Sequence, residues 1–267
     1  MTSLEMYAAT DVGMRRNHNE DCVKITPSHG IAVLADGMGG YNAGEVASAM
    51  AVDLISEQVR EKVLSIPKAA IDRATGFTGE SILLRQAIID ANDAIYQKAQ
   101  SDRQCAGMGT TVLAALFYAD RITAAHVGDS RMYRLRGGIL SHVTEDHSLI
   151  HEQVRRGLVT AADARNSMIK NLVTRALGIE AGVEPDIVED MVQPGDLYLM
   201  CSDGVTDVVA DELIQQTMSR YSKQLAEGAG KLIQLANDAG GPDNISVILI
   251  RADAEQKRGL FSRLLGK

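Results

Sequence analysis

Short runs of apolar residues, each bounded by turn residues, alternate along the chain with longer segments that have a helical period. CVKIT (residues 22–26) and IAVLA (residues 31–35) predict two strands joined by a turn of Pro, Ser and Gly. Further strands are predicted at TTVLAALFY, RITAAHVGD, SRMYRLRGG, ILSHV, DLYLMCSD and NISVILI. Ala-Asp, Gly-Asp and Gly-Gly turns separate the middle runs, which predicts hairpins and therefore antiparallel pairing.

Apolar residues at helical spacing predict the helices. Asn42 is expected to cap a helix from Ala43 to about Leu64, with Val46, Met50 and Leu54 on one face. A second helix is expected to begin at a Ser81 cap and to bury Leu84, Ile88, Ala91 and Ile95. Further helices are predicted over residues 146–156, DELIQQTMSRY and SKQLAEGAGKLIQLANDAG, and the polar residues 158–171 are expected to form an irregular flap.

Long helices and adjacent hairpins without a regular βαβ order predict antiparallel sheets covered by helices, which is an α+β fold. No linker divides the chain, so a single domain is predicted over residues 1–253. A short basic and apolar tail follows over residues 254–267. Its composition would suit contact with a membrane or a partner, but a frayed terminus is the simpler interpretation.

Composition and charge narrow the class of protein. The 267 residues are 45% hydrophobic, enough for a sizeable core, and no apolar run is long enough to span a bilayer. The first residues lack the apolar centre of a secretion signal, so a cytoplasmic protein is expected. The three cysteines are widely spaced, which argues against disulfides and structural zinc. A net charge of −8 argues against nucleic acid as a partner.

The stretch DGMGGYNAGE (residues 36–45) places a carboxylate at a strand end beside a glycine-rich turn. Its Gly39 and Gly44 have the spacing of a nucleotide phosphate loop, but Glu45 and Val46 stand where that loop needs Lys and Ser or Thr. The dinucleotide pattern lacks its third glycine, and a calcium loop would need alternating acidic residues after the first aspartate. The common phosphate-loop and calcium-loop interpretations therefore fail.

Acidic residues recur at the ends of predicted strands, each beside a glycine or a turn. One such aspartate is usually a turn residue, but strand ends that lie far apart in sequence can meet at one edge of a sheet. Clustered carboxylates need cations, and an oxygen-only set without His or Cys suits magnesium or manganese. The residues are Glu20 and Asp21, Asp36 with Gly37, Asp129, Asp203, and Asp243 with Asn244.

Ordered motifs give this pattern a family. RRNHNED, ADGMGG, GMGTTV, HVGDSR, TEDHS, TRALG, CSDG and GGPDN follow one another between Tyr7 and Arg251. Together they resemble the metal-dependent protein phosphatases of the phosphatase 2C-like family, in particular its bacterial branch. The resemblance implies a four-layer αββα sandwich, in which two antiparallel sheets pack face to face with helices on both outer faces. It also implies hydrolysis of phosphoserine and phosphothreonine in proteins, using two or three Mg²⁺ or Mn²⁺ ions.

The resemblance assigns the central ions to particular residues. Asp36 is expected to bridge them, the Gly37 carbonyl to bind one, and Asp203 and Asp243 to bind the other. Asn244 is expected to orient Asp243. The shared water then attacks phosphorus in line, so no protein nucleophile is needed.

Further residues are assigned around this centre. Glu20 and Asp21 stand where the family holds metal-bound waters or a metal directly, and Asp129 is expected to share a weaker third ion with Asp203. Arg16 is expected to bind the phosphate, because its planar fork matches two phosphate oxygens.

Some positions depart from the family or are assigned no chemistry. Cys201 and Ser202 are not expected to act as nucleophiles. Animal members carry a histidine where this chain has Met38, so the general acid is unassigned; water is the first candidate, ahead of His18, His126 and His147. Bacterial relatives often carry His-Pro in the flap, where this chain has Ser167-Met168.

The expected partners are phosphorylated proteins and a cognate Ser/Thr kinase, in a signalling pathway, with the chain itself a monomer. Two alternatives stay open at this point. One is a metal-dependent phosphoesterase for small metabolites, and the other is a catalytically silent phosphoprotein-binding regulator, although such regulators typically lose the metal ligands that this chain keeps.

Overall fold

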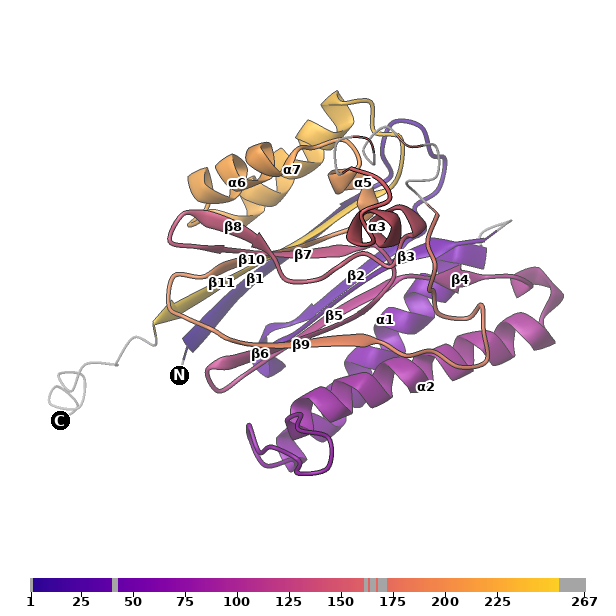
Figure 1. Ribbon diagram of the computed structural model, residues 1–267, viewed down its shortest axis with the longest axis horizontal. Coiled ribbons are helices and arrows are strands. Elements are labelled where there is room, and N and C mark those ends of the chain that lie inside the picture. The colour runs from indigo at the N-terminus through magenta and orange to yellow at the C-terminus, as the bar shows by residue number, and fades with distance from the viewer. Residues whose placement is uncertain (1, 40–42, 161–162, 164–166, 168–171, 255–267) are drawn as a thin grey trace, which may run out of the picture.

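Hydrogen-bonded strands form two antiparallel sheets, each with one helix-covered face (Figure 1). The computed structural model describes residues 2–39, 43–160, 163, 167 and 172–254. The first sheet runs in the order β1 (Thr2–Asp11), β11 (Ile245–Ala254), β10 (Leu197–Cys201), β7 (Arg131–Arg136) and β8 (Ile139–His142). The second runs in the order β2 (Asp21–Thr26), β3 (Ile31–Met38), β5 (Val112–Tyr118), β6 (Arg121–Val127) and β9 (Asp186–Met191), with β4 (Gly109–Thr110) paired to β3.

The helices lie outside the two sheets, so the predicted αββα sandwich is confirmed (Figure 1). The second sheet is covered by α1 (Ala43–Lys62) and α2 (Gly79–Ser101), and the first by α5 (Asp203–Thr206), α6 (Asp211–Arg220) and α7 (Leu225–Asp238). Short α3 (Leu149–Arg155) and the 3₁₀ turns η1 (Pro27–His29), η2 (Val63–Ser65) and η3 (Arg103–Cys105) complete the described elements. Most of the predicted flap, and the tail beyond Ala254, lie outside the described residues.

Helix α1 buries a different face from the one that its period predicted. Val46 and Leu54 are 37% and 38% exposed, and Met50 is only partly buried. The buried stripe is offset by one residue, because small side chains let a helix approach the strands closely. It contains Ala47, Ala51, Ile55 and Val59, each 0% exposed. The predicted cap, Asn42, lies outside the described residues.

The beginnings of two other helices also differ from the prediction. Helix α2 is capped by Thr78, whose hydroxyl accepts a hydrogen bond from the Ser81 N–H, so Ser81 lies inside the first turn. Helix α3 begins at Leu149, capped by Ser148, rather than at Asp146. The apolar face predicted for α2 is confirmed: Leu84, Ile88, Ala91 and Ile95 are all 0% exposed.

Strands β1 and β9 were not predicted, because polar residues interrupt their apolar pattern. Strand β1 pairs along its whole length with β11, from Thr2 opposite Ala254 to Asp11 opposite Ile245. Both β1 and β9 lie at sheet edges, where one side of the strand has no neighbour and side chains meet solvent. The first and last described strands are therefore neighbours in one sheet.

Apolar side chains fill each of the three spaces between layers. Leu34, Leu113 and Met200 are among those buried between the two sheets. In the same layer, the rings of Phe117 and Tyr198 meet edge to face at 5.3 Å, so β5 and β10 contact across the interface. This packing between the layers holds the ends of the strands at fixed positions.

We expect Leu34→Ala to lower the free energy of unfolding by about 2–5 kcal/mol, because Leu34 is 0% exposed and its loss leaves a cavity between the sheets. The matched control is Leu64→Ala, since Leu64 is 72% exposed and its truncation should change the free energy by no more than about 0.5 kcal/mol. Urea unfolding of both variants measures the difference, and equal losses would contradict this account of the core.

Candidate active site

The predicted acidic residues converge at one end of the sandwich. Asp21 begins β2 and is the direct partner of Asp36, which lies inside β3 because that strand continues to Met38. Asp129 lies between β6 and β7, Asp203 begins α5 after β10, and Asp243 precedes β11. The negative charges of Asp21, Asp203, Asp129 and Asp243 all act on Asp36, so strand ends from both sheets meet there.

Burial and mutual repulsion perturb these carboxyl groups strongly. Burial, followed by the neighbouring charges, raises the pKa of Asp36 well above its ordinary value, and the pKa of Asp203 rises for the same reasons. Burial also raises the pKa of Asp21 to about 6 and that of Asp129 to about 6. A cluster of this kind is stable at neutral pH only with protons or cations among its oxygens.

Two carboxylate oxygens in the cluster are buried without a hydrogen-bond donor. Asp21 Oδ1 and Asp203 Oδ1 have no partner, although the other Asp21 oxygen accepts a 2.8 Å hydrogen bond from Ser202 Oγ. Buried polar atoms in native proteins are almost always satisfied, so these oxygens point to a missing partner. Carboxylate and carbonyl oxygens are the ligands that Mg²⁺ and Mn²⁺ favour, and the residues present fit such ions.

Arg16 reaches the cluster across a tight contact between two loops. Its Nη2 donates a 2.7 Å hydrogen bond to Asp243 Oδ2, although the two residues are 227 positions apart. Gly13 makes the approach possible, because its φ is +80° and a Cβ there would lie 2.1 Å from the Asp243 carbonyl oxygen. The Met14 and Arg15 N–H groups both donate to the Gly241 carbonyl. The Arg16 side chain is 50% exposed, so its outer face is open to solvent.

Gly37 is required by packing at the point where β3 meets α1. A Cβ on Gly37 would lie 2.2 Å from the Gly44 carbonyl oxygen, and the Gly37 N–H donates to the Glu20 carbonyl at 3.1 Å. The Glu20 side chain lies against Gly44, and burial raises its pKa. Because Gly37 and Gly44 have no side chain, the backbone at Glu20, Gly37 and Gly44 can meet beside Asp36. Any larger residue at position 37 would clash with this backbone.

Asn244 holds the loop that carries Arg16 rather than the carboxylate of Asp243. Its side-chain Nδ2 donates to the Val12 and His18 carbonyls at 2.9 Å each, and its Oδ1 accepts from the Glu20 N–H at 2.8 Å. Only its backbone N–H donates to Asp243, at 2.8 Å. The side chain of Asn244 therefore contacts the Arg16 loop and Glu20, and its one described contact with the Asp243 carboxylate is through the backbone.

No supporting role was predicted from the sequence for several residues that hold the acids. Ser202 is buried and links Asp21 to the Ser246 N–H, and Thr111 accepts a hydrogen bond from the Asp36 N–H at 3.2 Å. Arg131 forms an ion pair with Asp146 at 2.6 Å, and the Asp146 charge also acts on the Asp129 carboxyl. The motifs CSDG, GTT, HVGDSR and TEDHS contain these residues, but a motif alone does not say which side chains touch.

The cysteine, serine and histidine side chains near the acidic cluster are mostly buried. Cys201 and Ser202 are fully buried, and burial raises the pKa of the Cys201 thiol to about 12, so neither suits a nucleophile. His126 and His147 are 2% and 4% exposed, which keeps them away from a bound phosphoprotein. His18 is exposed on the Arg16 loop, and Met38 is half-buried at the end of β3.

Comparisons with known proteins agree with this arrangement. The chain is 39% identical to the serine/threonine phosphatase Stp of Listeria monocytogenes over 251 residues, which cover 93% of this chain and 96% of that protein. It is 36% identical to the serine/threonine protein phosphatase PstP of Mycobacterium tuberculosis over 93% of this chain and 45% of PstP. A crystal structure of PstP gives a TM-score of 0.83 at 34% identity, covering 95% of this chain and 100% of that chain.

The family follows from these matches. A structure of the PstP catalytic domain in complex with two manganese ions gives a TM-score of 0.82 at 34% identity, over 95% of this chain and 100% of that chain. The family model described as Protein phosphatase 2C matches residues 15–236. The chain therefore belongs to the protein phosphatase 2C family, and the family predicted from the motifs is confirmed. Among the described helices, none has the length and apolarity that a membrane span needs.

We expect Asp129→Asn to stabilise the metal-free protein at pH 7.5 and to do so much less near pH 4.5. The folded state raises the pKa of Asp129 to about 6, so it binds the proton more tightly than the unfolded chain, and stability falls as the pH rises from about 4 to above 6. A shift from 3.8 to about 6 corresponds to about 3 kcal/mol, which is the largest gain that the variant can show.

Urea unfolding with EDTA at both pH values measures this effect as the difference between variant and wild type, so that histidines and other titrating groups cancel. Added Mn²⁺ should reduce the advantage of the variant at pH 7.5 if Asp129 binds the cation, because only the wild type has that carboxylate. An equal effect of the substitution at both pH values would contradict the repulsion described here.

Proposed function

We propose that this chain hydrolyses phosphoserine and phosphothreonine in proteins, with Mg²⁺ or Mn²⁺ held by the acidic cluster. The observation that carries the proposal is the convergence of carboxylates with unpartnered buried oxygens beside a half-exposed arginine. Both parts suit a phosphate monoester, since cations offset its negative charge and the planar guanidinium donates to its oxygens. The names of the relatives, serine/threonine phosphatases, support the same activity.

The ion-binding roles follow from where each acid lies. We assign the bridging position to Asp36, because the charges of the other acids all act on it, and a further oxygen ligand to the Gly37 carbonyl. Asp203 and Asp243 would complete the central ions, with Asp21 and Glu20 beside them and Asp129 holding a third ion with Asp203. When bound, such ions polarise the phosphoryl oxygens and lower the pKa of water toward neutrality.

The protein's own groups bind and orient the substrate. Arg16 uses one donor on Asp243, which leaves the rest of its fork to face a phosphoryl group at the open rim. Asn244 and Gly13 fix the loop that carries Arg16, so the guanidinium is held in place before the substrate arrives. His126 and His147 are buried and do not reach the substrate. The released serine or threonine oxygen is therefore protonated by solvent or by His18, which is exposed.

The biological setting is inferred from the cysteines, the strand pairing and the open rim. We place the chain in the cytoplasm, which free thiols at all three cysteines suit, as a monomer that opposes a cognate Ser/Thr kinase. We assign residues 1–253 to one catalytic domain, since β1 and β11 pair from end to end. The open rim around Arg16 suits a phosphorylated segment of a protein.

We expect Asp36→Asn and Asp203→Asn to lower phosphate release from a phosphothreonine peptide with Mn²⁺ by about 100-fold or more, the equivalent of about 3 kcal/mol of transition-state stabilisation. Asp53→Asn is the matched control, because Asp53 lies on the outer helix α1 and pairs with Lys24. Full activity in both cluster variants would contradict the proposed site. A preference for small phosphorylated metabolites over the peptide would favour a metabolite phosphoesterase, and absence of Mn²⁺ binding would favour a silent regulator.

We expect Arg16→Ala to raise the KM for the phosphopeptide and to lower kcat/KM by about 30-fold, because a hydrogen bond to a charged group contributes about 2 kcal/mol. Manganese binding measured by calorimetry should stay within about twofold of wild type, since Arg16 offers no ligand atom for a cation. Arg15→Ala is the neighbouring control. Loss of manganese binding in Arg16→Ala would show instead that Arg16 maintains the shape of the cluster.

A further inference from the structure

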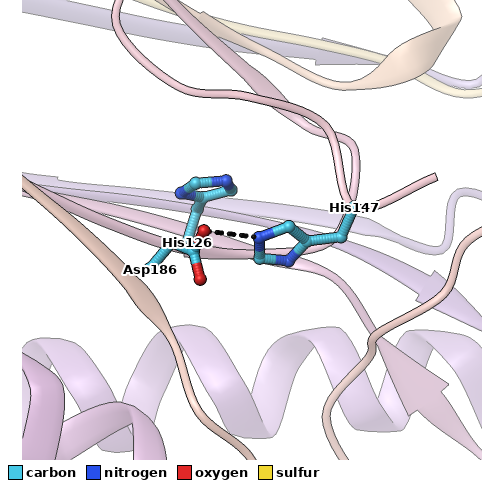
Figure 2. A group of neighbouring side chains, drawn as sticks. All are labelled: His126, His147 and Asp186. Atoms are coloured by element: carbon cyan, nitrogen blue, oxygen red, sulfur yellow. Dashed lines mark ion pairs between the residues drawn. The ribbon is translucent and has the colours of Figure 1, made fainter. Parts of the chain in front are cut away.

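A second polar cluster lies behind Asp129, formed by His126, His147 and Asp186 (Figure 2). His126 and Asp186 are direct partners on the neighbouring strands β6 and β9. His147 enters from the segment between β8 and α3, and its ring stacks on His126 with centroids 4.5 Å apart and planes 25° apart. The dashed line in Figure 2 joins His147 Nε2 to Asp186 Oδ2, which are 3.2 Å apart.

Hydrogen bonds fix where each ring carries its proton. His126 Nε2 lies 2.7 Å from the Glu145 carbonyl oxygen, so that nitrogen is the donor. His147 Nδ1 accepts from the Gly128 N–H at 3.1 Å, so its proton is on Nε2, facing Asp186. Burial, followed by the charges of His126 and Arg175, lowers the pKa of His147 to about 4, which keeps the ring neutral at physiological pH.

The cluster has the composition of a transition-metal site, but its geometry argues against one. An imidazole binds a metal ion in the plane of its ring, and two stacked rings only 25° from parallel cannot both direct lone pairs at one ion. The lone pair of His147 is already used by the Gly128 N–H. Asp186 also pairs with Arg175 at 2.7 Å, which places a positive charge beside the carboxylate.

The same contacts hold the residue before Asp129 from both sides. Two hydrogen bonds join His147 to Gly128. The ring Nδ1 of His147 accepts from the Gly128 backbone N–H, and the backbone N–H of His147 donates to the Gly128 carbonyl at 2.9 Å. On the opposite side, a Cβ on Gly128 would lie 2.5 Å from Thr111 Cβ, and the φ of Gly128 is +114°. The backbone at Gly128 therefore has little freedom, and the direction of Asp129 follows from it.

His147 also begins a short pairing with residues 172–174, which follow the segment predicted as a flap. Its carbonyl accepts from the Thr174 N–H at 2.8 Å, and the next residue, Ser148, forms a β-bridge with Val173. The Leu149 N–H donates to the Leu172 carbonyl at 3.0 Å. His147 thus contacts both the Asp129 turn and Thr174, and the two residues that follow it pair with Val173 and Leu172.

We propose that His147, through its hydrogen bond with the Gly128 N–H, is a positioning residue that fixes Asp129 for its most weakly held cation. This inference rests on the proposed function, because it takes Asp129 as a cation ligand. His147 Nε2 lies 3.2 Å from the Asp186 carboxylate without forming a hydrogen bond to it, the ring accepts from the Gly128 N–H through Nδ1, and the backbone at Gly128 sets the direction of Asp129. Neither histidine touches the substrate or the ion.

The test compares His147→Phe with His147→Asn. Phenylalanine keeps a ring to stack on His126 but cannot accept from the Gly128 N–H, whereas the Asn side-chain oxygen stands near the position of Nδ1 and can accept. Mn²⁺ is titrated by calorimetry into each metal-free protein. His142→Phe is the matched control, since His142 is exposed on β8.

We expect His147→Phe to weaken the most weakly bound Mn²⁺ by about 10-fold or more, with the tighter ions unchanged, because groups that orient a ligand typically change metal affinity by that factor. His147→Asn should restore most of the affinity, and His142→Phe should match wild type. Activity as a function of Mn²⁺ concentration should shift in parallel, so that kcat is recovered at high Mn²⁺.

The outcomes separate the two proposals. A wild-type protein that binds no Mn²⁺ would overturn the proposed function, and this inference with it. A wild type with only two bound ions, or a His147→Phe variant whose weakest ion binds as in wild type, would overturn the positioning role and leave the phosphatase activity intact. An Asn variant as weak as the Phe variant would also overturn it, since the acceptor would then not be the feature that matters.

Discussion

Mutual repulsion among buried carboxylates is the constraint on which the rest of this structure depends. Asp21, Asp36, Asp129 and Asp203 all have raised pKa values because the fold gathers them where water is scarce. Such a cluster opposes folding unless cations occupy it, so the remaining layers must hold it together by other means. Apolar packing between the two sheets and beneath both helical layers supplies that stability away from the charges.

Neutral groups hold several of the acids and the Arg16 loop in position, while Asp243 also pairs with the charged Arg16. Ser202 donates to Asp21, Thr111 accepts from the Asp36 N–H, and Asn244 ties the Arg16 loop to the rim. Neutral groups fit this task because another fixed charge would compete with the cations or add to the repulsion. The stacked histidines behind Asp129 follow the same pattern, since burial keeps them uncharged.

Relatives that are named serine/threonine phosphatases share this chain's fold over nearly its whole length. The chain departs from animal members at Met38, whose thioether cannot donate a proton. In the structure Met38 lies half-buried at the end of β3, beside Gly37. The acids that the motifs predicted, Asp21, Asp36, Asp203 and Asp243, lie together in the structure, with Asp129 beside them.

The sequence by itself determined the strands with strong apolar runs, the buried face of α2, and the identities of the acids and of Arg16. These are local signals, since a period or an ordered motif can be read without knowing what lies opposite. Tertiary structure decided which face of α1 is buried, because the helix carries more than one apolar stripe and packing against the sheet buries only one of them. It also decided that β1 and β9 are strands, because each is held by pairing with a strand that is distant in sequence. Only the tertiary structure shows that Arg16 contacts Asp243 and that His147 contacts Gly128. Each contact joins segments that are far apart in the chain, and no local sequence pattern indicates which distant segments will pack together.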